Sequence, residues 1–446
     1  MAHADAPSSV TSLRAGIGRR SLTPPGGVFL VGYGDRNVGN RGVHDDIWAT
    51  ALVLDDGSSQ VAIVALDLLT INEHTVDAVR RILAPIEVVL CCSHTHSGPI
   101  AYADERSSRR NRGFVAVLVD RIVAAVNDAA ANLVPARMDF GESVAEVGIN
   151  RRQRESDGRI EIGRNPDGAC DRSVQVVGFW GDDGGSSPYR LATLVNFACH
   201  GTTLGPSNLL VSADWIGSMR DRVEAELGGL VLFLQGAGAN INPDVGWDVA
   251  SPFDQTAEVG ERVADAVLDA VAGGVEMLAA VPLRITRADA WLPTQADAIT
   301  EQPPRSYIEP LLSMAGLPKF AAPLVEPLLR QRYPWQPTIE ARDGRWAVPM
   351  RVNVLRIGDL GLVTFAAETF TEIGLAAKAA SPATRTLFAS VADGCVSYLA
   401  TAEAHAEGGY EVDMAPWSYR YPARLAPEGA QLALDVTTAA MSSLWE

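Results

Sequence analysis

Two histidines separated by one residue stand where an apolar run of the chain ends. His94 and His96 directly follow residues 86–92, whose sequence IEVVLCC is typical of a buried β-strand. In an extended segment, residues two apart point to the same face, so both imidazoles project together from the carboxyl end of this strand. Open α/β sheets build their sites at this edge, and the residues SGP that follow turn the chain.

A third histidine has the same kind of position. His200 lies in the segment NFACHGTT, at the end of the strand-like residues 191–199, and the chain contains seven histidines in all. A single histidine at a strand end is usually structural. Imidazoles that converge from two strand ends need a metal ion, a carboxylate or a proton to justify the arrangement. The spacing therefore favours a metal site and leaves the other two readings open.

The elements that position these residues follow an α/β order. Apolar runs of strand length alternate with segments of helical periodicity. In residues 112–133, for example, apolar side chains recur at intervals of three and four and form one core-facing side of a helix. The predicted strands are 51–56, 60–69, 86–92, 191–199, 230–235, 350–358, 361–368 and 386–392, and the predicted helices are 72–83, 112–133, 214–227 and 252–272.

Residues 291–345 interrupt this order with many prolines. Proline is poorly tolerated inside helices and central strands, so a Pro-rich helical insertion is expected here. One alternative is a surface excursion without a role. The other is a lid, because long irregular segments in a regular fold are often functional and this one carries aromatic residues that suit the wall of an apolar pocket.

Composition and charge exclude several classes of protein. Of 446 residues, 47% are hydrophobic and 20% are charged, which is the ordinary globular range. The formal net charge of -17 comes from dispersed acidic residues, so we expect no nucleic-acid partner and no stable membrane association. The first residues lack the basic start and apolar core of a secretory signal, and a cytoplasmic location is expected. The five cysteines show no paired spacing, which indicates buried free thiols, and a homo-oligomer is compatible with the sequence.

Six motifs occur in a fixed order, namely AGIGRRSLTPP, GVHDDIWATALVLDD, VALDLL, SHTHSGP, FACHGTTLGPSNLLVSADWIG and LFLQGAGANINPD. Together they resemble the neutral/alkaline non-lysosomal ceramidase family, from about Leu13 to Pro422. We therefore expect a ceramidase-like catalytic domain over residues 1–446. Its expected fold class is α/β, with mixed β-sheets packed as a sandwich and flanked by helices.

The resemblance also implies a set of metal ligands. The histidines that bind zinc in the family match His94 and His200, and the glutamate and tyrosine ligands match Glu368 in FAAETFTEIG and Tyr398 in CVSYLAT. Two nitrogen and two oxygen ligands suit Zn2+. Taken without the resemblance, Glu368 reads as a helix cap and Tyr398 as a core aromatic residue.

Further residues match by their motifs. His96 matches the catalytic histidine of the family, Tyr410 in GGYEV matches a tyrosine twelve positions after the ligand tyrosine, and Arg151 in GINRR matches an active-site arginine. The adjacent Arg152 is the alternative to Arg151. Asp67 and Asp214 also match family motifs and are candidates for orienting histidines, although Asp214 suits a helix cap equally well.

The chain departs from the family at Asn242. The ceramidases have a serine in the corresponding loop, whereas QGAGANINPD places an asparagine there. A carboxamide is no nucleophile, but it can orient a substrate or stabilise an oxyanion.

The sequence thus predicts a zinc-dependent hydrolase in which zinc-activated water attacks an amide. The expected substrate is a small-molecule amide with an apolar portion, because the chain lacks a basic or amphipathic membrane face and the additional carboxyl-terminal β-domain of the ceramidases. Two alternatives stay open. The same site suits an esterase, a lactonase or an amide-forming enzyme, and loss of the serine is compatible with a non-catalytic, zinc-stabilised binding protein.

Overall fold

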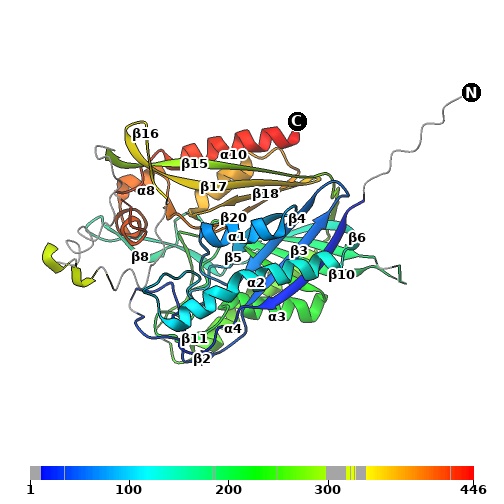
Figure 1. Cartoon of the computed structure of the whole chain (residues 1–446), viewed down its shortest axis with the longest axis horizontal. Coiled ribbons are helices and arrows are strands. Elements are labelled where there is room, and N and C mark those ends of the chain that lie inside the picture. Colours follow the sequence, from blue (N-terminus) through cyan, green and yellow to red (C-terminus); the bar gives the residue numbers. More distant parts are fainter. Residues whose placement is uncertain are drawn as a thin grey trace, which may run out of the picture.

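Two β-sheets face each other and helices cover their outer faces (Figure 1). The structure is a computed structural model that describes residues 12–34, 36–182, 184–185, 187–247, 249–297, 318–321, 323–325, 327, 338–421 and 423–446. Within these residues the larger sheet has nine strands, in the order β12 (Leu230–Gln235), β10 (Tyr189–Phe197), β9 (Ser173–Gly181), β6 (Val134–Val144), β1 (Arg14–Ser21), β3 (Trp48–Asp55), β4 (Gln60–Leu66) and β5 (Glu87–Cys92), with β14 (Glu276–Leu278) paired to β6. The smaller sheet has five, in the order β15 (Leu283–Asp297), β17 (Arg345–Ile357), β18 (Leu360–Phe365) and β20 (Arg385–Ala389), with β16 (Glu340–Arg342) paired to β17.

Both sheets are mixed, as predicted. The parallel pairs are β4 with β5, β10 with β12 and β18 with β20. Parallel neighbours need a crossover, and here each pair is joined by a helix, namely α1 (Glu73–Leu83), α3 (Trp215–Leu227) and α7 (Thr371–Ala379). The chain that leaves the carboxyl ends of β5, β10 and β18 carries His94, His200 and Glu368 respectively. The crossovers therefore direct these three residues toward the sheet edge that a site would use.

Successive residues of a strand face opposite sides of its sheet, so one strand contacts both the other sheet and the covering helices. In β3, Leu52 and Leu54 belong to the apolar layer between the sheets, together with Leu362 of β18. Ala51 and Val53 of the same strand face the helices instead. Strands buried on both faces read as continuous apolar runs, which is why the sequence predicted them well.

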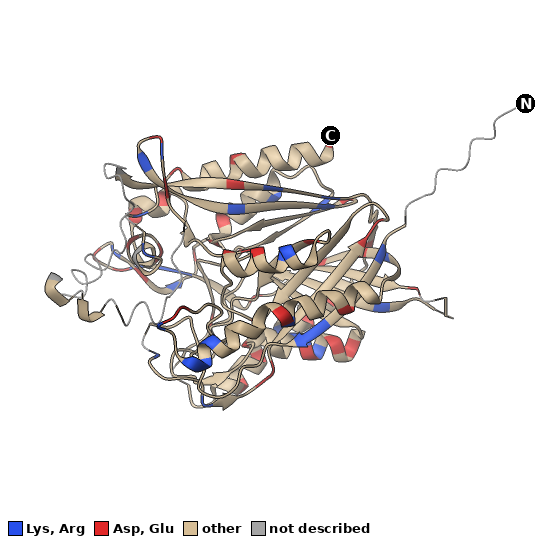
Figure 2. Cartoon of the chain, viewed as in Figure 1, with Lys and Arg blue, Asp and Glu red and all other residues tan. Residues whose placement is uncertain are grey.

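The helices predicted from the 3.6-residue period are present. Helices α1, α2 (Arg109–Ala131), α3 and α4 (Pro252–Ala272) cover the larger sheet, and α7 and α10 (Gly429–Trp445) cover the smaller one. In α2 the buried face contains Phe114, Leu118, Ile122 and Val126. Acidic and basic residues both occur along α1, α2, α3 and α4 (Figure 2). The structure thus confirms mixed sheets flanked by helices.

The predicted boundaries of the Pro-rich insertion, residues 291–345, were wrong at both ends. Residues 291–297 continue β15, and residues 340–342 and 345 belong to β16 and β17. Proline removes a backbone donor, which a sheet tolerates at an edge, and β15 is an edge strand in which Pro293 pairs with Ala347. Most of the remaining segment lies outside the described residues, so its role as a lid stays a prediction, as does the assignment of residues 1–446 to one domain.

Across the ranges that the structure describes, no helix combines the length and the apolar character that crossing a bilayer requires. All five cysteines are free.

Candidate metal centre

His94 lies where the chain turns after β5. Its backbone has a φ of 61°, in the left-handed region that residues other than glycine rarely occupy and that often marks functional sites. Its backbone N–H donates to Leu68 O at 3.0 Å, and ring Nδ1 lies 2.9 Å from Leu69 O. Because Nδ1 donates to a carbonyl, the lone pair of the neutral ring is on Nε2.

His200 reaches the same place from the end of β10. Its Nδ1 lies 2.7 Å from Gly238 O and 3.1 Å from Ile241 O, so this ring also has its lone pair on Nε2. Trp215 at the start of α3 donates its indole N–H to His200 O at 2.9 Å. Backbone carbonyls and a buried indole therefore fix both the tautomer and the position of this imidazole.

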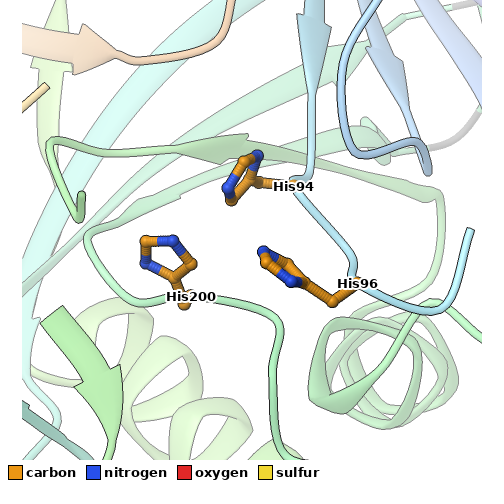
Figure 3. Close-up of side chains that lie close together, drawn as sticks. All are labelled: His94, His96 and His200. Atoms are coloured by element: carbon orange, nitrogen blue, oxygen red, sulfur yellow. The ribbon is translucent and has the colours of Figure 1, made fainter. Parts of the chain in front are cut away.

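The two histidine loops are tied to each other. Thr95 and Gly201 form a parallel β-bridge, and the backbone N–H of His96 donates to Gly201 O at 2.9 Å. The rings of His94, His96 and His200 point toward one common space (Figure 3). One ring nitrogen of each lies within 4.8 Å of the others.

Glu368 and Tyr398 are direct neighbours in a pair of short parallel strands. These strands are β19 (Glu368–Thr369) and β21 (Tyr398–Leu399), and Glu368 is the register partner of Tyr398. Register partners project to the same face of a sheet, so the carboxylate and the phenol lie side by side. Both residues are buried. Glu368 is not the cap of α7, whose N-cap is Phe370, and its carboxylate faces the histidines, while Tyr398 also packs in the apolar core.

The distances between these groups fit a bound metal ion. Glu368 Oε2 lies 3.3 Å from His94 Nε2 and 3.5 Å from His200 Nε2. In a tetrahedral zinc site with bonds of about 2.0–2.1 Å, neighbouring ligand atoms are about 3.3–3.4 Å apart. A carboxylate oxygen and an imidazole lone pair repel each other at such distances unless a proton or a cation lies between them. His94 Nε2 and Glu368 Oε2 are buried without a hydrogen-bond partner.

The protonation states also suit a cation. Burial, with the charge of Arg151, lowers the pKa of His200 to about 4, so this imidazole is neutral at pH 7. Burial alone would raise the pKa of Glu368, but the facing imidazoles hold it well below its ordinary value. Burial next to Glu368 raises the pKa of the Tyr398 phenol well above its ordinary value. The centre therefore presents an ionised carboxylate beside a neutral imidazole, a combination that suits zinc.

His96 stands beside the carboxylate and the two other imidazoles. Burial and the neighbouring histidines lower the pKa of His96 well below its ordinary value, and neither ring nitrogen has a hydrogen-bond partner. Its ring packs edge-on against Tyr33, with centroids 5.1 Å apart. A Cβ at Gly32, whose φ is 108°, would lie 2.5 Å from His96 Nδ1, so only glycine fits there. Packing thus fixes a ring whose nitrogens are available for proton transfer.

Arg151, Asn242 and Tyr410 surround the His200 side of the centre. Arg151 Nη1 lies 3.3 Å from His200 Nε2 and 3.3 Å from Asn242 Oδ1. The guanidinium carbon is 5.5 Å from the centroid of the Tyr398 ring and 5.9 Å from that of Tyr410. The structure therefore brings Arg151, Asn242 and Tyr410 to the candidate ligands.

Arg151 and Arg152, the two alternatives for the active-site arginine, differ in the partners of their side chains. Arg152 donates to Glu411 Oε2 at 2.8 Å, to Gly408 O at 2.8 Å and to Glu407 Oε2 at 3.3 Å. All three partners lie in residues 407–411. Arg151 is the arginine that reaches the histidines.

Asp67 and Asp214 were candidates for orienting histidines, but the structure gives their carboxylates other partners. Asp67 accepts from Arg220 Nη1 at 2.6 Å and from the backbone of Trp48 at 2.9 Å. Asp214 caps α3 and accepts from Thr203 N at 3.0 Å. Backbone carbonyls, rather than these carboxylates, accept from the imidazoles.

Tyr419 is a site residue that the sequence did not reveal. Its hydroxyl donates to Glu368 Oε1 at 3.1 Å, and the thiol sulfur of Cys395 lies 3.4 Å from the same hydroxyl oxygen. Because Oε1 is engaged by Tyr419, Oε2 is the oxygen left to face the histidines. No motif marks Tyr419, which lies in the unremarkable segment WSYRYP.

A cavity of about 100 Å³ opens beside these groups. Its wall contains His94, His96 and Glu368 together with the tyrosines at 102, 398, 410 and 419 and the apolar side chains of Leu69 and Ile71. A substrate in this cavity would therefore meet both candidate ligands and aromatic rings.

Comparisons with known proteins agree with this geometry. Residues 13–233 match the model of the family described as neutral/alkaline non-lysosomal ceramidase, N-terminal. The neutral ceramidase of Pseudomonas aeruginosa is 24% identical over 477 aligned positions, which cover 89% of this chain and 68% of the relative. The crystal structure of neutral ceramidase from Pseudomonas aeruginosa superposes with a TM-score of 0.73 at 22% identity, over 97% of this chain and 74% of the other. A ceramidase complexed with C2 gives a TM-score of 0.74 at 21% identity, over 98% and 75% of the two chains. The motif order, the matching family model and the shared fold make this chain similar to the neutral/alkaline non-lysosomal ceramidase family over most of its length.

Proposed function

We propose that this protein is a zinc-dependent hydrolase that cleaves an amide bond. The observation that carries the proposal is the buried approach of Glu368 Oε2 to His94 Nε2 and His200 Nε2, at 3.3 and 3.5 Å, since these acceptor atoms repel each other unless a proton or a cation lies between them and the distances suit zinc. Tyr398, the register partner of Glu368, would complete a set of two nitrogen and two oxygen ligands. The relatives, which are named neutral ceramidases, support hydrolysis of an amide.

When bound at these ligands, zinc supplies a Lewis acid and lowers the pKa of water. The side chains account for the rest of the reaction. His96, whose ring nitrogens have no partner, accepts a proton as water adds to the carbonyl carbon and returns it to the nitrogen as the C–N bond breaks. Arg151 and Tyr410 are placed to stabilise the negative charge that develops on the carbonyl oxygen. The products are a carboxylic acid and an amine.

Asn242 has an orienting role in this proposal. Its Oδ1 accepts from Arg151 Nη1, so it holds the guanidinium rather than attacking the substrate. This assignment replaces the family serine by a residue that cannot form a covalent acyl intermediate.

The proposed substrate is an amide with an apolar portion, of the ceramide-like kind that the relatives suggest. The aromatic and aliphatic wall of the cavity favours an apolar group next to the carbonyl. We propose that the substrate is dispersed in water rather than drawn from a bilayer, since acidic and basic residues are interspersed along the helices.

Metal analysis tests the centre directly. We expect one zinc per chain, and loss of this zinc in His94→Ala and in His200→Ala. His74→Ala is the matched control because His74 is exposed on α1, and it should retain the metal. Full metal occupancy in both centre variants would remove these residues from the ligand set.

Hydrolysis of a panel of N-acyl amines and the matching esters tests the reaction. A chelator should abolish cleavage, and added zinc should restore it. Faster cleavage of esters than of amides would favour the esterase alternative, and no cleavage by a zinc-loaded, folded chain would favour a binding protein.

A further inference from the structure

Two neighbouring arginines, Arg151 and Arg152, hold the same buried carboxylate. Arg151 Nε donates to Glu411 Oε1 at 2.8 Å, and Arg152 Nη1 donates to Glu411 Oε2 at 2.8 Å. Glu411 is 2% exposed. Neighbouring residues of a regular strand point to opposite faces, so an ordinary strand would not aim both side chains at one partner.

A β-bulge interrupts the pairing of β7 (Gly148–Arg154) with the next strand beside these arginines, and its extra residue lies in that next strand. Asn150 pairs with Asn165 of β8 (Ile160–Asn165), and Arg152 pairs with Ile162, so the register shifts across Arg151. On the other side of β7 the pairing is regular, and the backbone N–H of Arg151 donates to Asn240 O at 2.8 Å in continuation of the register in which Asn150 pairs with Ile241. Bulges bend a strand and re-aim its side chains, and they are frequent beside active sites.

Glu411 belongs to the segment that carries Tyr410. It lies in a single π-helical turn, η2 (Tyr410–Met414), a form that is rare and frequent at functional sites. Gly408 and Gly409 precede this turn with φ of 78° and 101°, and Arg152 Nη2 donates to Gly408 O at 2.8 Å. The two glycines allow the chain to double back over β7.

One carboxylate thus connects two groups of the proposed site that come from distant parts of the chain. Glu411 fixes Arg151 through Nε, so Nη1 reaches His200 and Asn242, while Nη2 is buried without a partner. The same residue anchors the turn in which Tyr410 lies, 5.9 Å from the guanidinium carbon. Burial alone would lower the pKa of Arg151, but Tyr398 and Glu411 raise it, so the guanidinium keeps its charge.

We infer that Glu411 is a positioning residue, which sets Arg151 and Tyr410 in the geometry that stabilises the developing oxyanion. It does not touch the substrate itself. The inference rests on the proposed function, because it concerns how the site handles a negatively charged oxygen.

A double-mutant cycle tests this role. Glu411→Gln keeps the shape of the side chain and removes its charge, and Glu411→Asp keeps the charge on a shorter stem in case the first variant does not fold. We expect either to lower kcat about tenfold to hundredfold with little change in KM, because misplacement of a group that acts in the transition state costs turnover. In a chain that already carries Arg151→Lys, the same change at Glu411 should cost less than about threefold further.

Glu407→Gln is the matched control. Glu407 is a half-exposed glutamate that binds Arg152 and Arg154. We expect this variant to keep kcat within about twofold, since Arg151 keeps its partner. Equal losses from changes at Glu407 and Glu411, or the same loss from Glu411→Gln with and without Arg151→Lys, would overturn the inference.

Binding of benzoate, measured by calorimetry on the zinc-loaded chain, separates this inference from the proposed function. A correctly placed Arg151 should bind this carboxylate without any turnover, and Glu411→Gln should weaken its binding about tenfold while Glu407→Gln leaves it unchanged. A wild-type chain that binds benzoate and cleaves nothing refutes the proposed reaction and leaves the positioning role standing. A wild-type chain that binds no benzoate, or a Glu411→Gln chain that binds it as tightly as wild type, refutes the positioning role.

Discussion

Replacing Asn242 by alanine measures what this residue does in place of the family serine. Asn242 Oδ1 accepts from Arg151 Nη1 at 3.3 Å, a long hydrogen bond from a charged donor. Such bonds contribute about 1.5–3 kcal/mol, and the length places this one at the lower end. Arg151 also keeps its 2.8 Å bond to Glu411, so the guanidinium should stay near its position. At about 1.4 kcal/mol per tenfold change, we expect kcat to fall about tenfold to thirtyfold.

The assay is single-turnover hydrolysis of the best amide of the panel in isotopically labelled water. Label should enter the released acid in both wild type and Asn242→Ala, because water is the nucleophile in the proposed reaction. Asn165→Ala is the matched control, since Asn165 belongs to the same three-stranded sheet and pairs with Asn150 on the far side of β7. Its kcat should be unchanged.

Two results would refute the reasoning. A loss of more than about a thousandfold in Asn242→Ala would exceed what one orienting hydrogen bond provides and would place Asn242 in the chemistry itself. Trapping of an acyl group on any side chain would replace direct attack by water with a covalent mechanism.

Three further predictions concern groups around the centre. Tyr419→Phe removes the hydrogen bond to Glu368 Oε1. Groups that orient metal ligands typically contribute about tenfold to hundredfold to metal affinity. We therefore expect the zinc affinity of this variant, measured in a competition assay with a chelating dye, to fall by about tenfold. Burial raises the pKa of the Glu73 carboxyl from its ordinary 4.5 to about 7. Between these pH values the folded chain holds a proton that the unfolded chain releases, so the free energy of unfolding falls as pH rises from about 4.5 to about 7. Glu73→Gln should therefore raise the free energy of unfolding in urea by about 1–3 kcal/mol at pH 8 and by much less at pH 5, and an equal gain at both values would contradict the assigned pKa. Gly32→Ala would push a methyl group against His96 Nδ1, and it should lower kcat at least about tenfold while zinc content is unchanged.

The sequence predicted the histidine part of the centre for a physical reason. Strands β5 and β10 are buried on both faces, so each reads as one apolar run with a sharp end, and the residues just past that end are those that line a sheet edge. Periodicity could therefore mark His94 and His200 as residues at strand ends, whereas their approach to each other is a property of the fold, because five strands lie between β10 and β5 in the sheet. What periodicity does not show is the left-handed backbone at His94 or the carbonyls that fix each imidazole.

The oxygen side of the centre depended on the family resemblance. Glu368 and Tyr398 lie in strands of two residues, which are too short to produce any pattern in the sequence. Their proximity comes from a register that only the folded chain shows. Tyr419 had neither a pattern nor a family motif, and its role follows from one hydrogen bond.

The choice between Arg151 and Arg152 shows why local reasoning stops where it does. Strand β7 has the sequence GINRRQR, which reads as a polar loop because its arginines are buried by ion pairing rather than by apolar contacts. Even with the strand known, alternation allows only one of the two arginines to face any partner, and a shift of one residue reverses which one it is. In the structure both arginines nevertheless bind Glu411, and only Arg151 continues to His200. The arginine that we propose to be catalytic is therefore positioned by a carboxylate more than two hundred residues away in the chain, which accepts a hydrogen bond from Arg151 Nε.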